Sequence, residues 1–103
     1  MYRYTTPTLP ITIDDVDFSE VDNFRIAIEF DKNQSLLFVV PANDARVDVE
    51  NRTIVLTLTQ EETASFTAGY AKLQVRIVYT SHAVQATPIV PVTIKDVIDE
   101  VIA

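Results

Sequence analysis

The side chains that could catalyse a reaction are few and lie far apart in this sequence. His82 is the only histidine and there is no cysteine, so a nucleophile activated by imidazole would be a serine that depends on His82. Ser81 adjoins His82, but neighbours in a turn rarely reach nucleophile–base geometry. We therefore expect His82 to face solvent in a turn, and we predict no catalytic residue. The serines that folding could bring near it are Ser19, Ser35 and Ser65.

The densest group of possible cation ligands lies between residues 14 and 22. Oxygen-rich loops can bind Ca²⁺, but this segment lacks the glycine of an EF-hand turn and is interrupted by Val16 and Phe18. Runs of charged residues are mostly exposed, so we expect a solvated loop and predict no metal site. The residue types alone do not decide whether this loop binds a cation. Its acidic residues are Asp14, Asp15, Asp17, Glu20 and Asp22.

A second pair of carboxylates, Glu61 and Glu62, could in principle serve in glycoside hydrolysis. Thr59 stands three residues before Glu62, which is the spacing of a capping box at the start of a helix. Capping explains these residues without catalysis, and so small a domain has little room for a substrate pocket. We predict that the protein is not an enzyme and takes no cofactor.

Four tyrosines could stack on sugars or bases. Tyr70 and Tyr79 stand at the ends of an expected strand, where we expect buried rings and wet hydroxyls. Tyr2 and Tyr4 flank Arg3 near the start of the chain, with no obvious anchor. We predict that Tyr2 and Tyr4 contact a partner.

The composition is that of a globular chain with a hydrophobic core. Hydrophobic residues make up 48% of the 103 residues and charged residues 22%, which excludes a disordered tail. We expect one domain over residues 1–103, with an N-terminal arm at 1–8 and a C-terminal tail at 96–103. The absence of cysteine excludes a disulfide scaffold, and the single glycine, Gly69, excludes glycine-rich phosphate loops.

The net charge of −7 predicts that nucleic acid is not a partner, because phosphate backbones require a basic face. Anionic membrane surfaces are disfavoured for the same reason. The first residues do not form a basic and then apolar leader, and no apolar run approaches the length of a membrane span. We expect a protein made inside the cell, with no membrane partner.

Alternation of apolar and polar residues with period two is the dominant pattern and indicates β-strands. It is clearest at residues 23–30 and 72–79. Residues 35–40 are apolar at nearly every position, so they form either a central strand covered on both faces or an edge that meets a partner. Further strands are expected at residues 9–13, 46–50, 53–58 and 84–94.

About seven short strands, with a turn near every tenth residue, predict a single immunoglobulin-like antiparallel β-sandwich. A five- or six-stranded barrel is the main alternative. Pro88 and Pro91 place the last strand at a sheet edge or give it a kink, because proline cannot donate to a ladder.

Two short helical pieces are also expected. The capping box predicts one or two helical turns at residues 59–66, with Gly69 leaving them in a left-handed conformation. Residues 96–103 carry an apolar stripe at helical spacing, which predicts a short C-terminal helical tail. The stripe consists of Val97, Ile98, Val101 and Ile102.

Apolar side chains near both ends of the chain favour function through assembly. The apolar run at residues 35–40 adds to them and exceeds what one small core covers. Exposed apolar surface of this kind usually meets a partner. We predict as partner contacts Tyr2, Tyr4, Val97, Ile98, Val101 and Ile102.

Several segments together resemble a known group of proteins. The opening strand reads YTTPTLPITI, the central segments read FRIAIEF, LTLTQEETASF and AKLQVRIVYT, and the tail reads DVIDEVI. In this order they resemble small phage and prophage structural proteins of Gram-positive bacteria, over nearly the whole chain. The pattern is also similar to the N-terminal immunoglobulin-like domain of phage baseplate upper proteins. One departure is the turn before the last strand, where that group usually has a glycine and this chain has Ser81, His82 and Ala83.

This resemblance implies a non-enzymatic virion structural or assembly protein that acts through protein–protein contacts. The implied partners are other phage structural proteins, with a homo-oligomer possible. The implied location is the virion, or the bacterial host cytoplasm during assembly. The alternative is a carbohydrate- or surface-binding β-sandwich module, with exposed tyrosines as its platform and the acidic loop as a calcium site.

Overall fold

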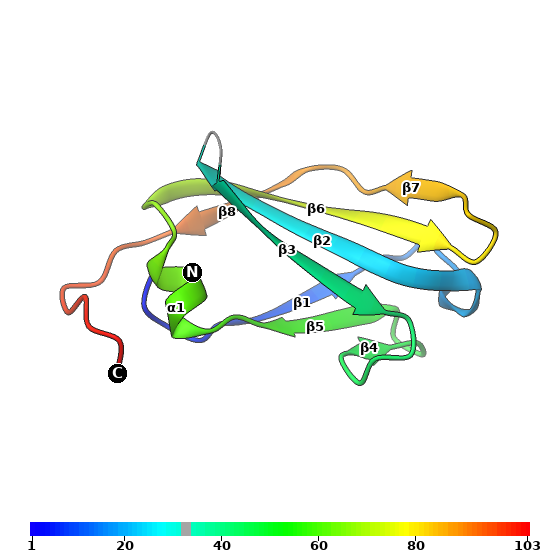
Figure 1. Cartoon of the computed structure of the whole chain (residues 1–103), viewed down its shortest axis with the longest axis horizontal. Helices are drawn as coiled ribbons and strands as arrows, with labels where there is room; N and C mark the ends of the chain where they lie inside the picture. Colours follow the sequence, from blue (N-terminus) through cyan, green and yellow to red (C-terminus); the bar gives the residue numbers. More distant parts are fainter. Residues whose placement is uncertain (32–33) are drawn as a thin grey trace.

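Two antiparallel β-sheets face each other in the computed structural model, which describes residues 1–31 and 34–103 (Figure 1). The first sheet has the order β1-β5-β4, with β1 at Thr8–Thr12, β5 at Thr53–Thr57 and β4 at Val47–Asp48. The second has the order β3-β2-β6, with β3 at Gln34–Pro41, β2 at Val21–Asp31 and β6 at Gly69–Tyr79. Strands β7 at Val84–Ala86 and β8 at Val90–Ile94 pair with the two halves of β6. The predicted all-β sandwich is confirmed.

The strand order within this sandwich differs from that of an immunoglobulin constant domain. There the first, second, fifth and fourth strands share one sheet, whereas here β2 lies in the other sheet, between β3 and β6. Strand β2 ends at Asp31 and β3 begins at Gln34. The two strands pair directly with each other, from Gln34 opposite Asp31 to Pro41 opposite Asn23. Strands β2 and β3 therefore stay in one sheet as a hairpin.

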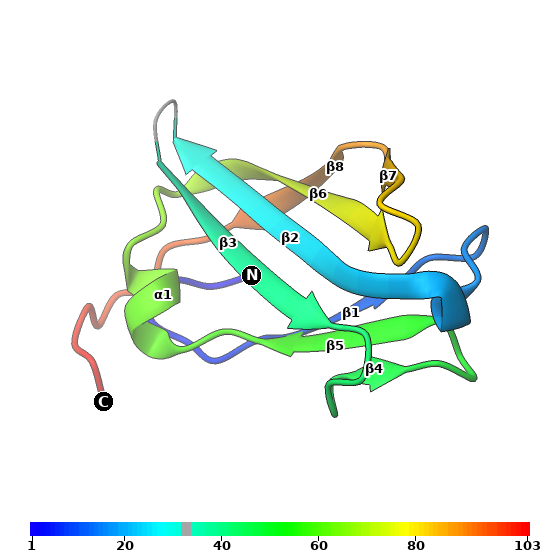
Figure 2. The ribbon, with the colours of Figure 1, turned by 45° about the vertical axis from the view of Figure 1, so that its right-hand side comes forward.

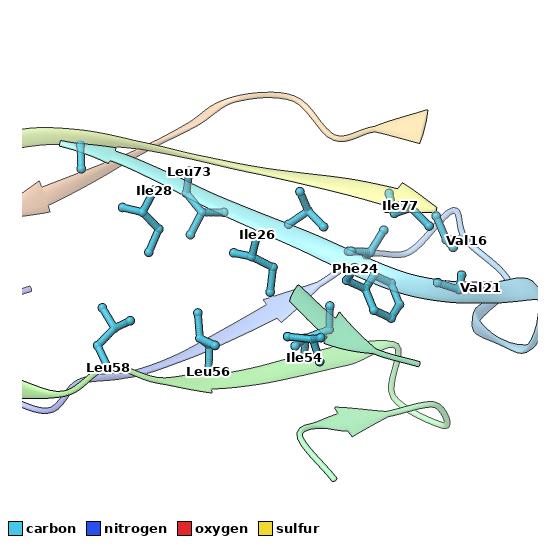
Figure 3. Close-up of a cluster of buried hydrophobic side chains, with 14 of the residues drawn as sticks. Val16, Val21, Phe24, Ile26, Ile28, Ile54, Leu56, Leu58, Leu73 and Ile77 are labelled. Atoms are coloured by element: carbon cyan, nitrogen blue, oxygen red, sulfur yellow. The ribbon is translucent and has the colours of Figure 1, made fainter. Parts of the chain in front are cut away.

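The core fills the space between the inner faces of the two sheets. Phe24, Ile26 and Ile28 alternate along β2 and are fully buried, as are Ile54 and Leu56 of β5. Figure 3 shows the inward side chains of β2 facing those of β5 across this space. Each such side chain stabilises the fold by about 1.5–3 kcal/mol through burial. No ladder joins the two sheets within residues 1–31 and 34–103, so the fold is a sandwich and not the alternative barrel.

Helix α1, at Gln60–Ala64, closes one end of the sandwich (Figure 1). The Thr59 hydroxyl accepts from the amide of Glu62, and the Glu62 carboxylate accepts from the amide of Thr59, so the predicted capping box is confirmed. Phe66 follows the helix and packs against Phe30 with ring centroids 4.8 Å apart. Gly69 then has a φ of 128°, a conformation that residues with a Cβ rarely adopt.

The chain differs from the sequence prediction at its tail. Residues 96–103 are not helical, although an apolar stripe at helical spacing predicts a helix. A segment this short cannot offset the cost of helix nucleation unless an apolar face packs against the domain, and Ile98 is fully exposed. No helix in the described part of the chain has the length and apolar character needed to cross a bilayer.

Residues 84–94 and 46–50 are also less regular than predicted. The expected strand at 84–94 is divided into β7 and β8 around Pro88, and β8 carries Pro91 at the sheet edge, as the prolines indicate. Of residues 46–50, only Val47–Asp48 pairs as β4. A short 3₁₀ helix, η1 at Phe18–Glu20, precedes β2.

Candidate interaction surface

The N-terminal arm is attached to the sandwich, although the sequence shows no anchor for it. Tyr2 forms a parallel bridge with Lys95, just beyond β8. The Lys95 amide donates to the Met1 carbonyl at 2.7 Å, and the Arg3 amide donates to the Lys95 carbonyl at 2.9 Å. The arm therefore continues the second sheet past β8, and Tyr2 and Tyr4 start from fixed backbone positions.

Arg3 joins the arm to both the helix and the tail. Its guanidinium donates to Asp96 Oδ1 at 2.7 Å and to the carbonyl of Ala64 at 2.9 Å, and it lies 3.6 Å from Glu100. The hydrogen bond to Asp96 raises the pKa of Arg3. Ala64 is the last residue of α1, where a helix favours a cation. Arg3 is therefore the point at which three segments distant in sequence are held together.

The tail is anchored at its far end as well. The Ala103 amide donates to Gln60 Oε1 at 2.8 Å, and Gln60 Nε2 donates to the Ala103 carbonyl at 3.0 Å. Residues 96–103 therefore run from the end of β8 back to α1, as Figure 2 shows. The tail is held at Asp96 by Arg3 and at Ala103 by Gln60.

The predicted contact residues of the tail face mostly outward between these two anchors. Ile98 is fully exposed, and the exposed fractions of Val101 and Ile102 are 65% and 43%. Val97 is the exception, because it is partly buried. The structure thus brings the predicted residues of arm and tail to the same end of the sandwich, and leaves three apolar side chains without cover there.

The tyrosines of the arm contact cations of the same chain. The Lys95 ammonium lies 5.6 Å from the ring centroid of Tyr2, and the Arg3 guanidinium lies 5.3 Å from that of Tyr4. Tyr2 is half-exposed and Tyr4 is partly buried. Cation–π contacts at exposed positions contribute about 0.5–1 kcal/mol, so these rings are oriented and not merely flexible.

Tyr70 and Tyr79 differ in burial, although the sequence predicts buried rings for both. Tyr70 is 80% exposed, so the expectation of a buried ring is wrong. It alternates with inward Ala71 and Leu73 on β6 and therefore belongs to the outer face. Tyr79 is partly buried, and its hydroxyl donates to Gln85 Oε1 at 2.7 Å.

Strand β3 is the outermost strand of the second sheet (Figure 2). Of the two alternatives for residues 35–40, the structure has the edge strand, paired with β2 alone within the described residues. Leu37 and Val39 are about half-exposed on its outer face, at 51% and 48%. Leu36 and Phe38 face inward but are only partly buried.

The acidic loop does not converge on a point. The Asp17 carboxylate accepts from the amide and the hydroxyl of Ser19, which lowers the pKa of Asp17. Asp22 instead accepts from the side chain of Asn23 at 2.8 Å. Within residues 1–31 and 34–103, no group of three or more histidine, aspartate or glutamate side chains lies close enough to hold a metal ion.

His82 lies exposed in the turn between β6 and β7. Two of the three serine hydroxyls suggested for it are engaged elsewhere: that of Ser19 donates to Asp17 and that of Ser65 to the Glu62 carbonyl. His82 has a φ of 72°, so the histidine occupies a left-handed backbone position that glycine adopts without steric cost.

A cleft of about 310 Å³ opens between the two sheets beside β1 and β7. Its walls are mainly apolar and include Ile11, Leu73 and Val75, with Asp14 and Asp15 at its rim. Both carboxylate side chains are exposed, as most charged side chains on a solvated loop are.

Comparisons of the chain with protein-family models, with curated proteins and with solved structures found no match. The fold class is therefore established by the geometry of the two sheets. Arg3 and Gln60 fix the arm and tail, and the hydroxyl of Thr63 hydrogen-bonds both backbone groups of Thr5 in the arm. No local sequence signature identifies these three residues.

Proposed function

We propose that this protein is a non-enzymatic structural or assembly component of a phage or prophage virion and acts through protein–protein contacts. Its partners in this proposal are other phage structural proteins. It resides in the virion, or in the bacterial host cytoplasm during assembly. The resemblance of the chain to small phage structural proteins supports the class.

The observation that carries the assembly role is the geometry of the tail. Arg3 holds Asp96 and Gln60 holds Ala103, while Ile98, Val101 and Ile102 remain exposed between these anchors. A free monomer gains nothing from holding apolar side chains in water. A partner that covers them gains apolar burial, and it loses less conformational entropy because the segment is already ordered.

Co-expression with the structural proteins encoded by neighbouring reading frames tests the proposal. The variant I98S/V101S removes two exposed apolar side chains of the tail. The control V49S/V84S removes two side chains of similar exposure, 54% and 51%, from elsewhere on the surface. We expect a stable complex with one such neighbour, lost in I98S/V101S and kept in the control. A chain that binds none of these neighbours, or equal binding by both variants, contradicts the proposal.

Deletion of residues 96–103 is a second test. Because most of the tail's apolar side chains are exposed, the deletion should change the size of the assembly more than the melting temperature. A large loss of thermal stability with unchanged mass would show that the tail belongs to the core.

A carbohydrate- or surface-binding module is the second candidate, favoured by the 80% exposure of Tyr70 and the half-exposure of Tyr2. Exposed aromatic rings are the usual platform for sugars. Sedimentation of the protein with purified bacterial cell-wall polysaccharide tests this function. Binding that is lost in both Y2A and Y70A would support it over virion assembly, and no binding by the unaltered protein would exclude this polysaccharide as the ligand.

A further inference from the structure

Strand β3 presents an open hydrogen-bonding edge. Its register with β2 runs from Gln34 opposite Asp31 to Pro41 opposite Asn23, and within the described residues no other strand pairs with it. In an antiparallel ladder alternate residues direct their N–H and C=O groups away from the partner strand. About half of the backbone groups of β3 therefore point to the outside of the sheet and can accept another strand.

This edge lacks the features that usually prevent pairing between sheets. Edge strands are commonly protected by charged residues, internal proline, a bulge or short length. Strand β3 has eight residues, carries no charge, and has its only proline at the last position, Pro41. The register shift in its ladder with β2 lies on β2, between Glu29 and Asp31, at the start of β3. Leu37 and Val39 are half-exposed on the outer face, and Leu36 and Phe38 are partly exposed on the inner face.

We propose that β3 pairs antiparallel with β3 of a second copy of this chain about a two-fold axis, so that one continuous sheet runs through the dimer. Antiparallel residues opposite each other point to the same face. If the axis passes near Phe38, Leu37 therefore lies beside Val39 of the other copy, and both side chains are on the outer face of the continuous sheet. On the inner face, the partly buried side chains of Leu36 and Phe38 in one copy lie beside those of the other copy and cover them.

A second copy is the partner that this strand fits best. A foreign strand would have to be apolar on both faces, and an identical strand satisfies this condition automatically, as isologous two-fold interfaces do. The chain also carries a net charge of −7, so two copies repel each other over most of their surfaces. Strand β3 has no charged side chain, so pairing β3 with β3 brings no like charges together along the strand.

This contact goes beyond the tail-mediated assembly proposed above, because it uses β3, at the opposite edge of the second sheet from β8 and the tail, and has a defined partner. The two proposals can therefore fail separately. I98S/V101S should leave the β3 dimer intact, and variants of β3 should leave contacts made by the tail intact.

The molar mass of the purified chain, measured by light scattering and sedimentation from micromolar to millimolar concentration, tests the dimer. We expect twice the chain mass at high concentration. In L37K/V39K four lysines meet across the two-fold axis, and like charges directly opposite destabilise a strand pair. Dimer affinity should fall by at least about tenfold. The control V55K/V84K makes the same charge change at positions 40% and 51% exposed and should dimerise normally.

Cysteine cross-linking provides an independent readout, because the natural chain has no cysteine. A two-fold axis places one residue of β3 opposite its own copy, within disulfide distance. Mild oxidation should cross-link one of the single variants L37C, F38C and V39C rapidly, and V84C slowly. The reactive position identifies the register, and melting curves verify that every variant is folded.

Four results would overturn the proposal. The first three are a monomer at all concentrations, a dimer equally stable in L37K/V39K and in V55K/V84K, and cross-linking of V84C as fast as that of the β3 variants. Protection of the amides of β3 only when another structural protein is present would also overturn it, because the partner would then be a foreign strand.

Discussion

The hydroxyl of Thr63 donates a hydrogen bond to the carbonyl of Thr5 at 2.8 Å and accepts one from the amide of Thr5 at 3.0 Å. Thr63 is fully buried, and it is the polar residue through which α1 holds the N-terminal arm. Both backbone groups of Thr5 are satisfied by one side chain 58 positions away.

The variant T63V should lower the free energy of unfolding by about 1–3 kcal/mol. Valine preserves the shape of the side chain but leaves the amide and carbonyl of Thr5 without partners near a buried site. Urea denaturation measures the loss. T57V is the control: the Thr57 hydroxyl shares an exposed hydrogen bond with the Thr8 hydroxyl, and its removal should change stability by less than about 0.5 kcal/mol. Equal effects of the two substitutions would contradict the assigned role of Thr63.

The variant H82G should raise the free energy of unfolding by about 0.5–1 kcal/mol. His82 has a φ of 72°, where a side chain is strained and glycine is not, although glycine loses more entropy on folding. Thermal melting followed by circular dichroism measures the gain. S81G, in the same turn but without a positive φ, should be neutral or destabilising. If H82G melts lower than S81G, the turn does not store this strain.

Asp44 should make stability depend on pH in acid. The Arg46 side chain, and after it the Arg46 amide, donate hydrogen bonds to its carboxylate and lower the pKa of Asp44 to about 2. Because the folded pKa lies below the unfolded value, the carboxylate stabilises the fold above about pH 4 and loses this effect as the pH falls toward about 2.

We therefore expect D44N to be less stable than the unaltered chain at neutral pH, with the difference closing between about pH 4 and pH 2. Urea titrations at a series of pH values measure this difference in the free energy of unfolding. D99N makes the same charge change at an exposed position in the tail and is the control; it should change stability much less than D44N at neutral pH. A D44N difference that persists unchanged at the lowest pH would contradict the role of the Asp44–Arg46 pair.

The variant R3Q should release the tail while leaving the sandwich folded. It removes the ion pair with Asp96 and shortens the donor that reaches the Ala64 carbonyl. Hydrogen exchange of residues 96–103 should accelerate by more than that of β2 or β6. R3K keeps the charge but not the planar fork that contacts both groups, and should show an intermediate rate. Unchanged exchange in R3Q would mean that Gln60 alone orders the tail.

The strands and the helix cap were predictable because their determinants are local. Alternation along residues 23–30 and 72–79 follows from the geometry of a strand with one buried face, and these residues lie in β2 and β6. Thr59 and Glu62 contact each other and are only three positions apart, so the capping box could be predicted from the sequence alone. The apolar stripe of the tail was misleading, because helical spacing produces a helix only where a surface covers it.

The arrangement of the candidate interaction surface depends on contacts between distant residues. Arg3 reaches Ala64 and Asp96, which are 61 and 93 positions away, and no local pattern marks it as the anchor of the tail. Tyr70 likewise points outward because of which alternate residues of β6 face the core, and the residue type does not determine this.

The sequence by itself determined that this chain is an all-β domain, where most of its strands lie and how α1 begins, because backbone periodicity and capping act over a few residues. Only the tertiary structure decided that β2 joins the sheet of β3 and β6, that β3 is left as an uncharged edge, and that the tail is fixed with Ile98 exposed. These properties arise from which surfaces of the chain find cover in the folded molecule, and that depends on the packing of all its elements at once.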